Sequence, residues 1–155
     1  MQLRIALSLP RDEVSVPVVR RIAAQSMAVL GVQGECVDEL QVALSEACAN
    51  VLRHADADDD YEVRLRVDGE TCVIDVVDRG VGVDLDRLGR TDAPVDAEAG
   101  RGIQLMRALV DEVEFSHGEP QGTTVSLTKH LDLTEDGVAS RLAAARAAGR
   151  PVPHG

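Results

Sequence analysis

The sequence lacks the features of a membrane-bound or secreted protein. Nowhere in its 155 residues is there a run of about 18 apolar residues, which a membrane-spanning helix requires. The N-terminus carries no basic region that leads into an apolar stretch. We therefore expect neither a transmembrane segment nor a secretion signal, and we expect a cytoplasmic location.

Positive charge is scarce. The chain has 16 basic residues against 27 acidic ones, a net charge of -11, and Lys129 is its only lysine. A field of this sign repels phosphate backbones and anionic lipid surfaces. We therefore expect no direct nucleic-acid partner and no membrane partner. Basic protein surfaces are more plausible partners, although acidic charge can also serve solubility alone.

Cysteine is also sparse, and its spacing excludes two roles. Cys36, Cys48 and Cys72 are odd in number, widely separated and outside any metal-ligand spacing. Three buried, reduced thiols are expected, as in a cytosolic protein. The acidic run 56–60 lacks the glycine and the terminal glutamate of a calcium loop, so it is interpreted as a solvated turn.

The periodicity of apolar residues predicts both strands and helices. Alternation predicts strands over residues 2–9 and 61–67, and a more continuous apolar run predicts a buried strand over 71–77. Two further strands, joined by a glycine- and proline-containing turn, are predicted over residues 112–116 and 123–131. Helical spacing predicts helices over residues 16–30, 35–55 and 103–110, and allows a short one over 137–148. The first helix is expected to bury Val18, Ile22, Met27 and Leu30, and the second Leu40, Leu44, Ala47 and Val51.

This order of elements, with two hairpins, predicts an α+β fold. We expect a two-layer sandwich in which helices cover one face of a mixed, mostly antiparallel sheet. Residues 1–131 are expected to form the folded domain. Residues 132–155 are expected to be a tail that is partly helical or disordered.

The most informative residues are Glu46 and Asn50. They lie four residues apart, and so on one face of the second predicted helix, at the border of its apolar stripe. A carboxylate beside a carboxamide is how an ATP site can hold a catalytic base next to a magnesium ligand. The pair therefore predicts a nucleotide site.

Two glycine-bearing segments support that prediction. Asp78 ends a predicted buried strand and can accept a hydrogen bond from an adenine amino group, while Gly80 and Gly82 let the ring approach. Gly100 and Gly102 precede a predicted helix, whose N-terminal amides suit phosphate. An ordinary Asp-x-Gly turn and a flexible loop are the alternative interpretations.

Other nucleotide-binding signatures are absent. The chain contains no Gly-Lys-Ser/Thr of a Walker loop and no Gly-x-Gly-x-x-Gly after a strand. Arg53 and His54 follow Asn50 by about one turn and can reach phosphates, although a surface arginine and a helix-end histidine explain them equally well. Thr123, after Gly122, is either a ligand or an ordinary strand residue.

Together, four segments resemble the N, G1, G2 and G3 boxes of the Bergerat-fold ATPases. They are the segments that contain Glu46 and Asn50, Asp78 to Gly82, Gly100 to Met106, and Gly122 with Thr123. That superfamily includes the ATP-binding domains of gyrase, heat-shock chaperones, histidine kinases and mismatch-repair proteins. Within it, the chain most resembles the bacterial anti-sigma-factor serine/threonine kinases. The resemblance covers about residues 3–131 and is carried by Glu46-x-x-x-Asn50, Asp78-x-Gly80-x-Gly82 and the segment from Gly100 to Met106.

The resemblance implies a kinase that binds ATP and Mg²⁺, sequesters a sigma factor and phosphorylates a serine or threonine on an anti-sigma-factor antagonist. It makes Glu46 the general base, Asn50 the magnesium ligand and Asp78 the adenine-reading residue. Residues 84–99 become a mobile ATP lid. The further expected nucleotide contacts are Arg53, His54, Gly80, Gly82, Gly100, Arg101, Gly102, Ile103 and Thr123.

The sequence also leaves alternatives. Asp56 stands where an aromatic residue often follows the His-Ala pair of this family. An ATP-binding anti-sigma or signalling regulator without kinase activity is one alternative, and an ATP-binding module with another signalling partner is a second. Glu46 favours the kinase over the inactive regulator. The resemblance further suggests a homodimer built on the first strand and the neighbouring helix.

Overall fold

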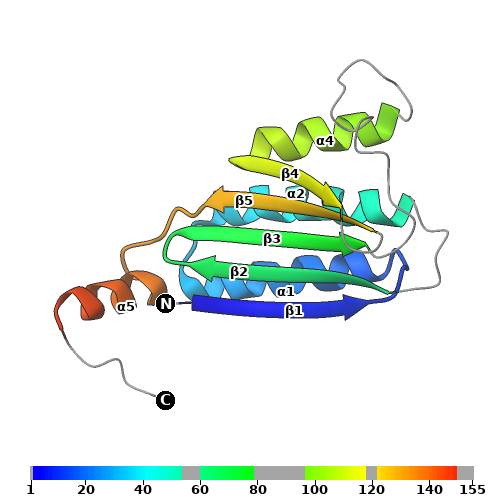
Figure 1. Cartoon of the computed structure of the whole chain (residues 1–155). Coiled ribbons are helices and arrows are strands. Elements are labelled where there is room, and N and C mark those ends of the chain that lie inside the picture. Colours follow the sequence, from blue (N-terminus) through cyan, green and yellow to red (C-terminus); the bar gives the residue numbers. More distant parts are fainter. Residues whose placement is uncertain (1, 54–59, 79–96, 118–121, 150–155) are drawn as a thin grey trace.

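The fold is given by a computed structural model that describes residues 2–53, 60–78, 97–117 and 122–149 (Figure 1). His54, Gly80, Gly82 and most of the expected lid lie outside the described residues. The elements, in chain order, are β1 (Gln2–Leu9), α1 (Ser15–Leu30), α2 (Gly34–Arg53), β2 (Tyr61–Asp68), β3 (Thr71–Asp78), α4 (Ala97–Leu109), β4 (Glu112–His117), β5 (Thr123–His130) and α5 (Val138–Ala147).

The five strands form one sheet in the order β1-β2-β3-β5-β4. Each neighbouring pair is antiparallel, so the described sheet is wholly antiparallel rather than mixed. Two helices connect β1 to β2, and the second returns the chain to the end of the sheet where β1 finished (Figure 1). The next strand must therefore run in the opposite direction. The predicted α+β sandwich is confirmed.

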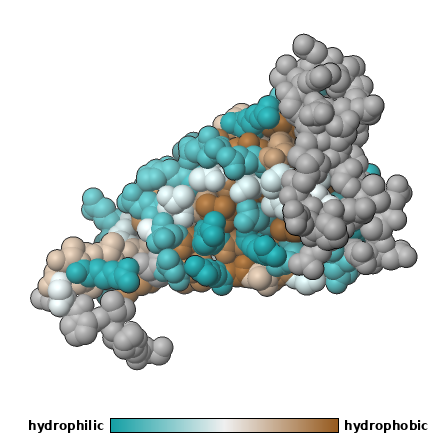
Figure 2. Space-filling model, in the orientation of Figure 1, coloured by the Kyte–Doolittle hydropathy of each residue, from teal (hydrophilic) through white to brown (hydrophobic). Residues whose placement is uncertain are grey.

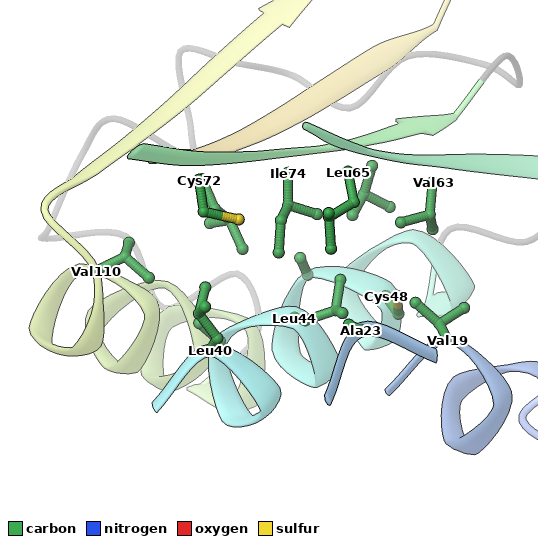
Figure 3. Packing of buried hydrophobic residues seen from close by; sticks show 14 of the residues in the cluster. Val19, Ala23, Leu40, Leu44, Cys48, Val63, Leu65, Cys72, Ile74 and Val110 are labelled. Atoms are coloured by element: carbon green, nitrogen blue, oxygen red, sulfur yellow. The ribbon is translucent and has the colours of Figure 1, made fainter. Parts of the chain in front are cut away.

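Hydrophobic packing between the sheet and α1, α2 and α4 forms the core. In Figure 3, Leu65 and Ile74 point from the sheet toward Leu44 of α2, and Val63 points toward Val19 of α1 and Cys48 of α2. Figure 2 shows the other face of the sheet, where hydrophilic residues surround a hydrophobic centre. One face of the sheet thus packs on helices while its other face is largely polar.

The second helix buries the residues that its periodicity predicts, and the first does so only in part. Leu40, Leu44, Ala47 and Val51 are all buried, as expected. In α1, Met27 and Leu30 are buried and Ile22 is partly buried, but the prediction for Val18 is wrong because this residue is 44% exposed. The residues that α1 buries are Ser15, Val19, Ala23, Met27 and Leu30. The predicted and observed buried faces share Met27 and Leu30, and they differ by one residue, or about 100°, in the first half of the helix.

The segment after β5 packs against the turn between α1 and α2. Gly31 ends α1 in the left-handed conformation with φ 83°. Its carbonyl accepts hydrogen bonds from the Thr134 backbone at 2.7 Å and from the Thr134 hydroxyl at 3.0 Å. A methyl group on Gly137 would lie 2.8 Å from the Gly31 Cα, so these two backbones meet because neither residue has a side chain.

Of the helices in the described ranges, none has the length and apolarity that crossing a bilayer requires.

Candidate functional site

The Glu46 carboxylate lies against the backbone of α4. Both α2 and α4 contribute to the core, and the two helices pack on each other at this point. A Cβ atom built at Gly102 would lie 2.6 Å from Glu46 Oε2 and 4.0 Å from Arg53 Nη1. The Glu46 carboxylate can therefore occupy this position only because Gly102 has no side chain. The structure brings Glu46, Arg53 and Gly102 together, as the sequence predicted for one site.

Asn50 lies one turn further along α2 and is 5% exposed. Its Oδ1 atom is buried and has no hydrogen-bond partner among the described residues. A buried oxygen left without a partner costs about 1–3 kcal/mol, so a native protein that keeps one usually has a use for it. A carboxamide oxygen is a ligand that Mg²⁺ prefers, and the orphaned atom fits that role.

The described residues offer no cluster of three or more histidine, cysteine, aspartate or glutamate side chains that would hold a metal alone. Magnesium sites in nucleotide enzymes commonly use one or two protein ligands together with substrate phosphates and water. The chemistry at Asn50 fits that kind of site better than a dedicated metal cage.

Asp78 occupies the end of β3 and is 3% exposed. Thr123 is its partner across the β3–β5 ladder and is 5% exposed. The Arg11 guanidinium forms an ion pair with the Asp78 carboxylate, and the Arg11 side chain is itself only 5% exposed. The sequence did not predict a role for Arg11, because a single arginine in a turn after Pro10 belongs to no pattern.

The glycines of the third segment lie differently from the prediction. Helix α4 begins at Ala97, so Gly100 and Gly102 are inside the helix rather than ahead of it. The sequence of residues 97–99 explains the difference, since alanine and glutamate are strong helix formers that extend the helix toward its N-terminus. Gly102 is buried, Gly100 and Arg101 are exposed, and Ile103 belongs to the hydrophobic core.

A buried polar cluster lies on the sheet side of α2. Ser15 Oγ and Tyr61 Oη are 2.5 Å apart, and the Ser15 hydroxyl also donates to the Asp12 carbonyl at 2.6 Å. Burial raises the pKa of the Cys48 thiol to about 12, which a hydrogen bond with Tyr61 only partly offsets. Although Cys48 stands between Glu46 and Asn50 in sequence, it remains a protonated thiol and is no nucleophile at neutral pH.

Comparison with known families identifies the domain. Residues 9–129 match the family described as the histidine kinase-like ATPase domain. The chain belongs to this family. The matched residues of this histidine kinase-like ATPase domain run from the end of β1 to the end of β5, and they include every residue of the candidate site. The nucleotide-binding superfamily predicted from the sequence is confirmed, and ATP is the nucleotide of that domain.

Curated relatives within this ATPase family are serine-protein kinases. The chain is 30% identical over 139 residues to the serine-protein kinase RsbW of Bacillus cereus, covering 83% of this chain and 85% of the relative. It is also 30% identical over 139 residues to RsbW of Bacillus velezensis, covering 83% of this chain and 86% of that protein. The predicted membership of this kinase family is confirmed.

Two solved structures share the fold. The RsbU and RsbW domains of Rv1364c from Mycobacterium tuberculosis match with a TM-score of 0.62 and 24% identity, over 83% of this chain and 32% of that one. The SiaB-SiaC complex from Pseudomonas aeruginosa matches with a TM-score of 0.62 and 13% identity, over 83% of this chain and 88% of that chain. At these identities the likeness concerns the fold alone.

Proposed function

We propose that this protein is an anti-sigma factor and a serine/threonine kinase. It sequesters a sigma factor, and it uses Mg-ATP to phosphorylate a serine or threonine on an anti-sigma-factor antagonist. The observation that carries the proposal is that the Glu46 carboxylate and the Arg53 guanidinium both lie near Gly102, one helical turn from the orphaned Asn50 oxygen on α2. This arrangement occurs in a chain whose relatives are serine-protein kinases.

In this mechanism Glu46 is the general base. Its carboxylate accepts the proton of the attacking hydroxyl, which the antagonist supplies. Phosphoryl transfer asks a protein mainly for positioning and charge neutralisation. Gly102 supports the positioning of Glu46, and the Arg53 guanidinium, which lies near the same point, neutralises phosphate charge.

The nucleotide is held by residues from three elements. Asn50 of α2 is the proposed Mg²⁺ ligand, and the bound ion would neutralise the charge of the transferring phosphates. Asp78 of β3 accepts a hydrogen bond from the adenine amino group, with Thr123 of β5 beside it. Gly100 and Arg101 of α4, together with Gly80, Gly82 and His54, complete the proposed contacts.

A homodimer is also proposed, built on the edge strand β1. The inward-facing residues Leu3, Ile5 and Leu7 are only partly buried, because β1 is the last strand on its side of the sheet. An apolar hollow between β1 and α1 adjoins them and includes Val19 and Ile22. A second copy would cover this surface.

Sigma-factor binding implies a cytoplasmic location. The kinase domain is proposed to end near residue 131, with residues 132–155 as a tail.

The test combines phosphate transfer with sigma binding. The protein is incubated with Mg-ATP and each candidate antagonist from its own genome, and mass spectrometry locates any new phosphate on serine or threonine. Glu46→Gln keeps the size of the side chain but removes the base. It should bind ATP within about threefold of the parent and transfer phosphate about 10²- to 10⁴-fold more slowly.

Two results would contradict this proposal. Equal transfer rates for the parent and Glu46→Gln would exclude Glu46 as the base. Sigma binding without any transfer to an antagonist would instead support the alternative, an ATP-binding regulator without kinase activity.

A further inference from the structure

The ion pair between Arg11 and Asp78 is the most buried pair of opposite charges among the described residues. The two side chains are 5% and 3% exposed, whereas the Glu62–Arg64 and Glu39–Lys129 pairs each include a side chain at least one-third exposed. Arg11 lies between β1 and α1, 67 residues before Asp78 in the chain. The fold therefore brings a remote arginine to the residue proposed to read the base.

A buried ion pair of this kind is weak evidence for a purely structural role. Removing two charges from water is costly, and apolar residues of similar volume often stabilise a fold as well or better. The position of the pair, at the end of β3 where the nucleotide site is proposed, suggests a use for the charge itself.

Contact with a cation changes which protonation state a buried carboxyl group favours. A carboxyl group that is buried without a cation favours its neutral form, and a guanidinium in contact favours the ionised form. An ionised carboxylate only accepts hydrogen bonds, and its two oxygens offer about four acceptor sites. The bond from Arg11 fills only part of this capacity.

We propose that Arg11 is a positioning residue for base recognition, which holds Asp78 ionised and oriented so that the site selects a purine with an amino group at C6. The inference rests on the proposed role of Asp78 in nucleotide binding. An adenine amino group donates to the carboxylate. Guanine presents an oxygen at the same position, which would face another acceptor and remain unpaired.

Without the cation this selectivity weakens. A neutral Asp78 carboxyl group can donate its proton as well as accept, so it can pair with an oxygen at C6. It also binds an amino group less strongly, because hydrogen bonds to a charged partner are the stronger ones.

The test is a thermodynamic cycle measured by titration calorimetry. Dissociation constants are measured for ATP, for GTP and for purine riboside triphosphate, which lacks the 6-amino group. The parent should bind ATP about 10- to 100-fold more tightly than the analogue, as expected for a hydrogen bond to a charged group. In Arg11→Met this ratio should fall to within about threefold, and the preference for ATP over GTP should shrink with it.

Two further variants separate charge from structure. Arg11→Lys keeps a cation and should restore at least part of the ratio, whereas Arg11→Gln keeps an N–H donor without charge and should behave like Arg11→Met. Lys129→Met is the matched control. It breaks the 2.7 Å Lys129–Glu39 pair, and Lys129 lies six residues from Thr123 along β5, about 20 Å from the site. It should lower stability without changing the ratio.

Each outcome decides between specific interpretations. An unchanged ratio of ATP to analogue in Arg11→Met or Arg11→Gln, with circular dichroism showing an intact fold, would overturn the role of Arg11 alone. An equal loss of affinity for all three nucleotides would also overturn it and assign Arg11 to structure. A parent protein that binds none of them would overturn the proposed function, and this inference with it.

Discussion

At the scale of single residues, Gly102 has the most specific task. A side chain there would lie 2.6 Å from Glu46 Oε2, closer than atoms approach without one of them moving. The atom that must move is the end of a flexible side chain, so the fold itself can adapt. Gly102 therefore affects the geometry of the site more than the stability of the protein.

We accordingly predict that Gly102→Ala separates stability from activity. Alanine should raise the stability of the α4 helix by up to about 1 kcal/mol. Displacing the Glu46 carboxylate should lower the rate of phosphate transfer about 10- to 100-fold at saturating ATP. Urea unfolding and the transfer assay measure the two effects. Gly100→Ala is the comparison for stability, because a Cβ atom at Gly100 would meet no atom within 4 Å. A full transfer rate in Gly102→Ala would contradict the prediction.

The site could be predicted from sequence where it depends on local spacing. Glu46 and Asn50 lie on one helical face because they are four residues apart, and their neighbours Leu44 and Ala47 fix which side of the helix is buried. Arg11 could not be predicted. Its contact with Asp78 exists only after β1, β2 and β3 have paired, and no periodicity links the two positions.

At the scale of elements, the contact of Gly31 with Gly137 joins α5 to the end of α1. A Cβ atom on Gly31 would lie 2.4 Å from the Gly137 Cα, which is a main-chain atom. Moving a backbone segment costs more free energy than moving the flexible end of the Glu46 side chain. The close approach thus links the tail segment to the body of the domain.

Gly31→Ala should therefore be more destabilising than its backbone conformation alone requires. Gly69 is the matched control, because it also has a positive φ, 60°, but a Cβ atom there would meet nothing within 4 Å. Gly69→Ala should cost about 1–2 kcal/mol for the left-handed conformation. Gly31→Ala should cost about 1–3 kcal/mol more, because the added group overpacks the contact. Urea unfolding measures the free energy of unfolding of both variants. Equal losses in the two variants would show that the contact with Gly137 does not contribute to the cost of Gly31→Ala.

The existence of the elements could be predicted better than their faces and ends. The apolar pattern located all five described strands, by alternation in β1 and β2 and by a more continuous apolar run in β3. The predicted start of α4 is too late, because Gly100 and Gly102 are interpreted as preceding the helix although residues 97–99 favour a helical conformation. The periodicity assigns Val18 to the wrong face because α1 carries valines on several sides. The packing of Val19 and Ala23 against the sheet decides how the helix is rotated.

At the scale of the whole molecule, several buried protonated groups make stability depend on alkaline pH. Burial raises the pKa of Cys48 and of Cys72 from the usual 9.0 to about 12, and that of Tyr61 from 10.0 to about 12. Each group keeps its proton in the folded state at a pH where the unfolded chain has lost it. Their contribution to stability is complete below about pH 9 and is lost as pH rises toward 12.

The free energy of unfolding should therefore fall between pH 9 and pH 11. While a thiol is ionised only in the unfolded chain, it lowers the free energy of unfolding by about 1.4 kcal/mol per pH unit. Cys48 and Cys72 together should therefore make this free energy fall steeply with pH. Urea titrations at half-unit intervals from pH 7.5 measure it. Cys72→Ala removes one of the two thiols and should give a shallower decline. Stability that stayed constant up to pH 11 would show that the thiols are not buried in the folded protein.

The strand order β1-β2-β3-β5-β4 also has a consequence for synthesis on the ribosome. Among the strands of the described residues, β5 is translated last, yet it lies inside the sheet between β3 and β4. Until residue 130 has emerged, the nascent chain presents β3 with an open edge beside the apolar residues Ile74 and Val76. Thr123 and Asp78 can meet only after that. The nascent protein is thus a candidate for chaperone binding during translation, and the proposed nucleotide site is complete only after β5 has been made.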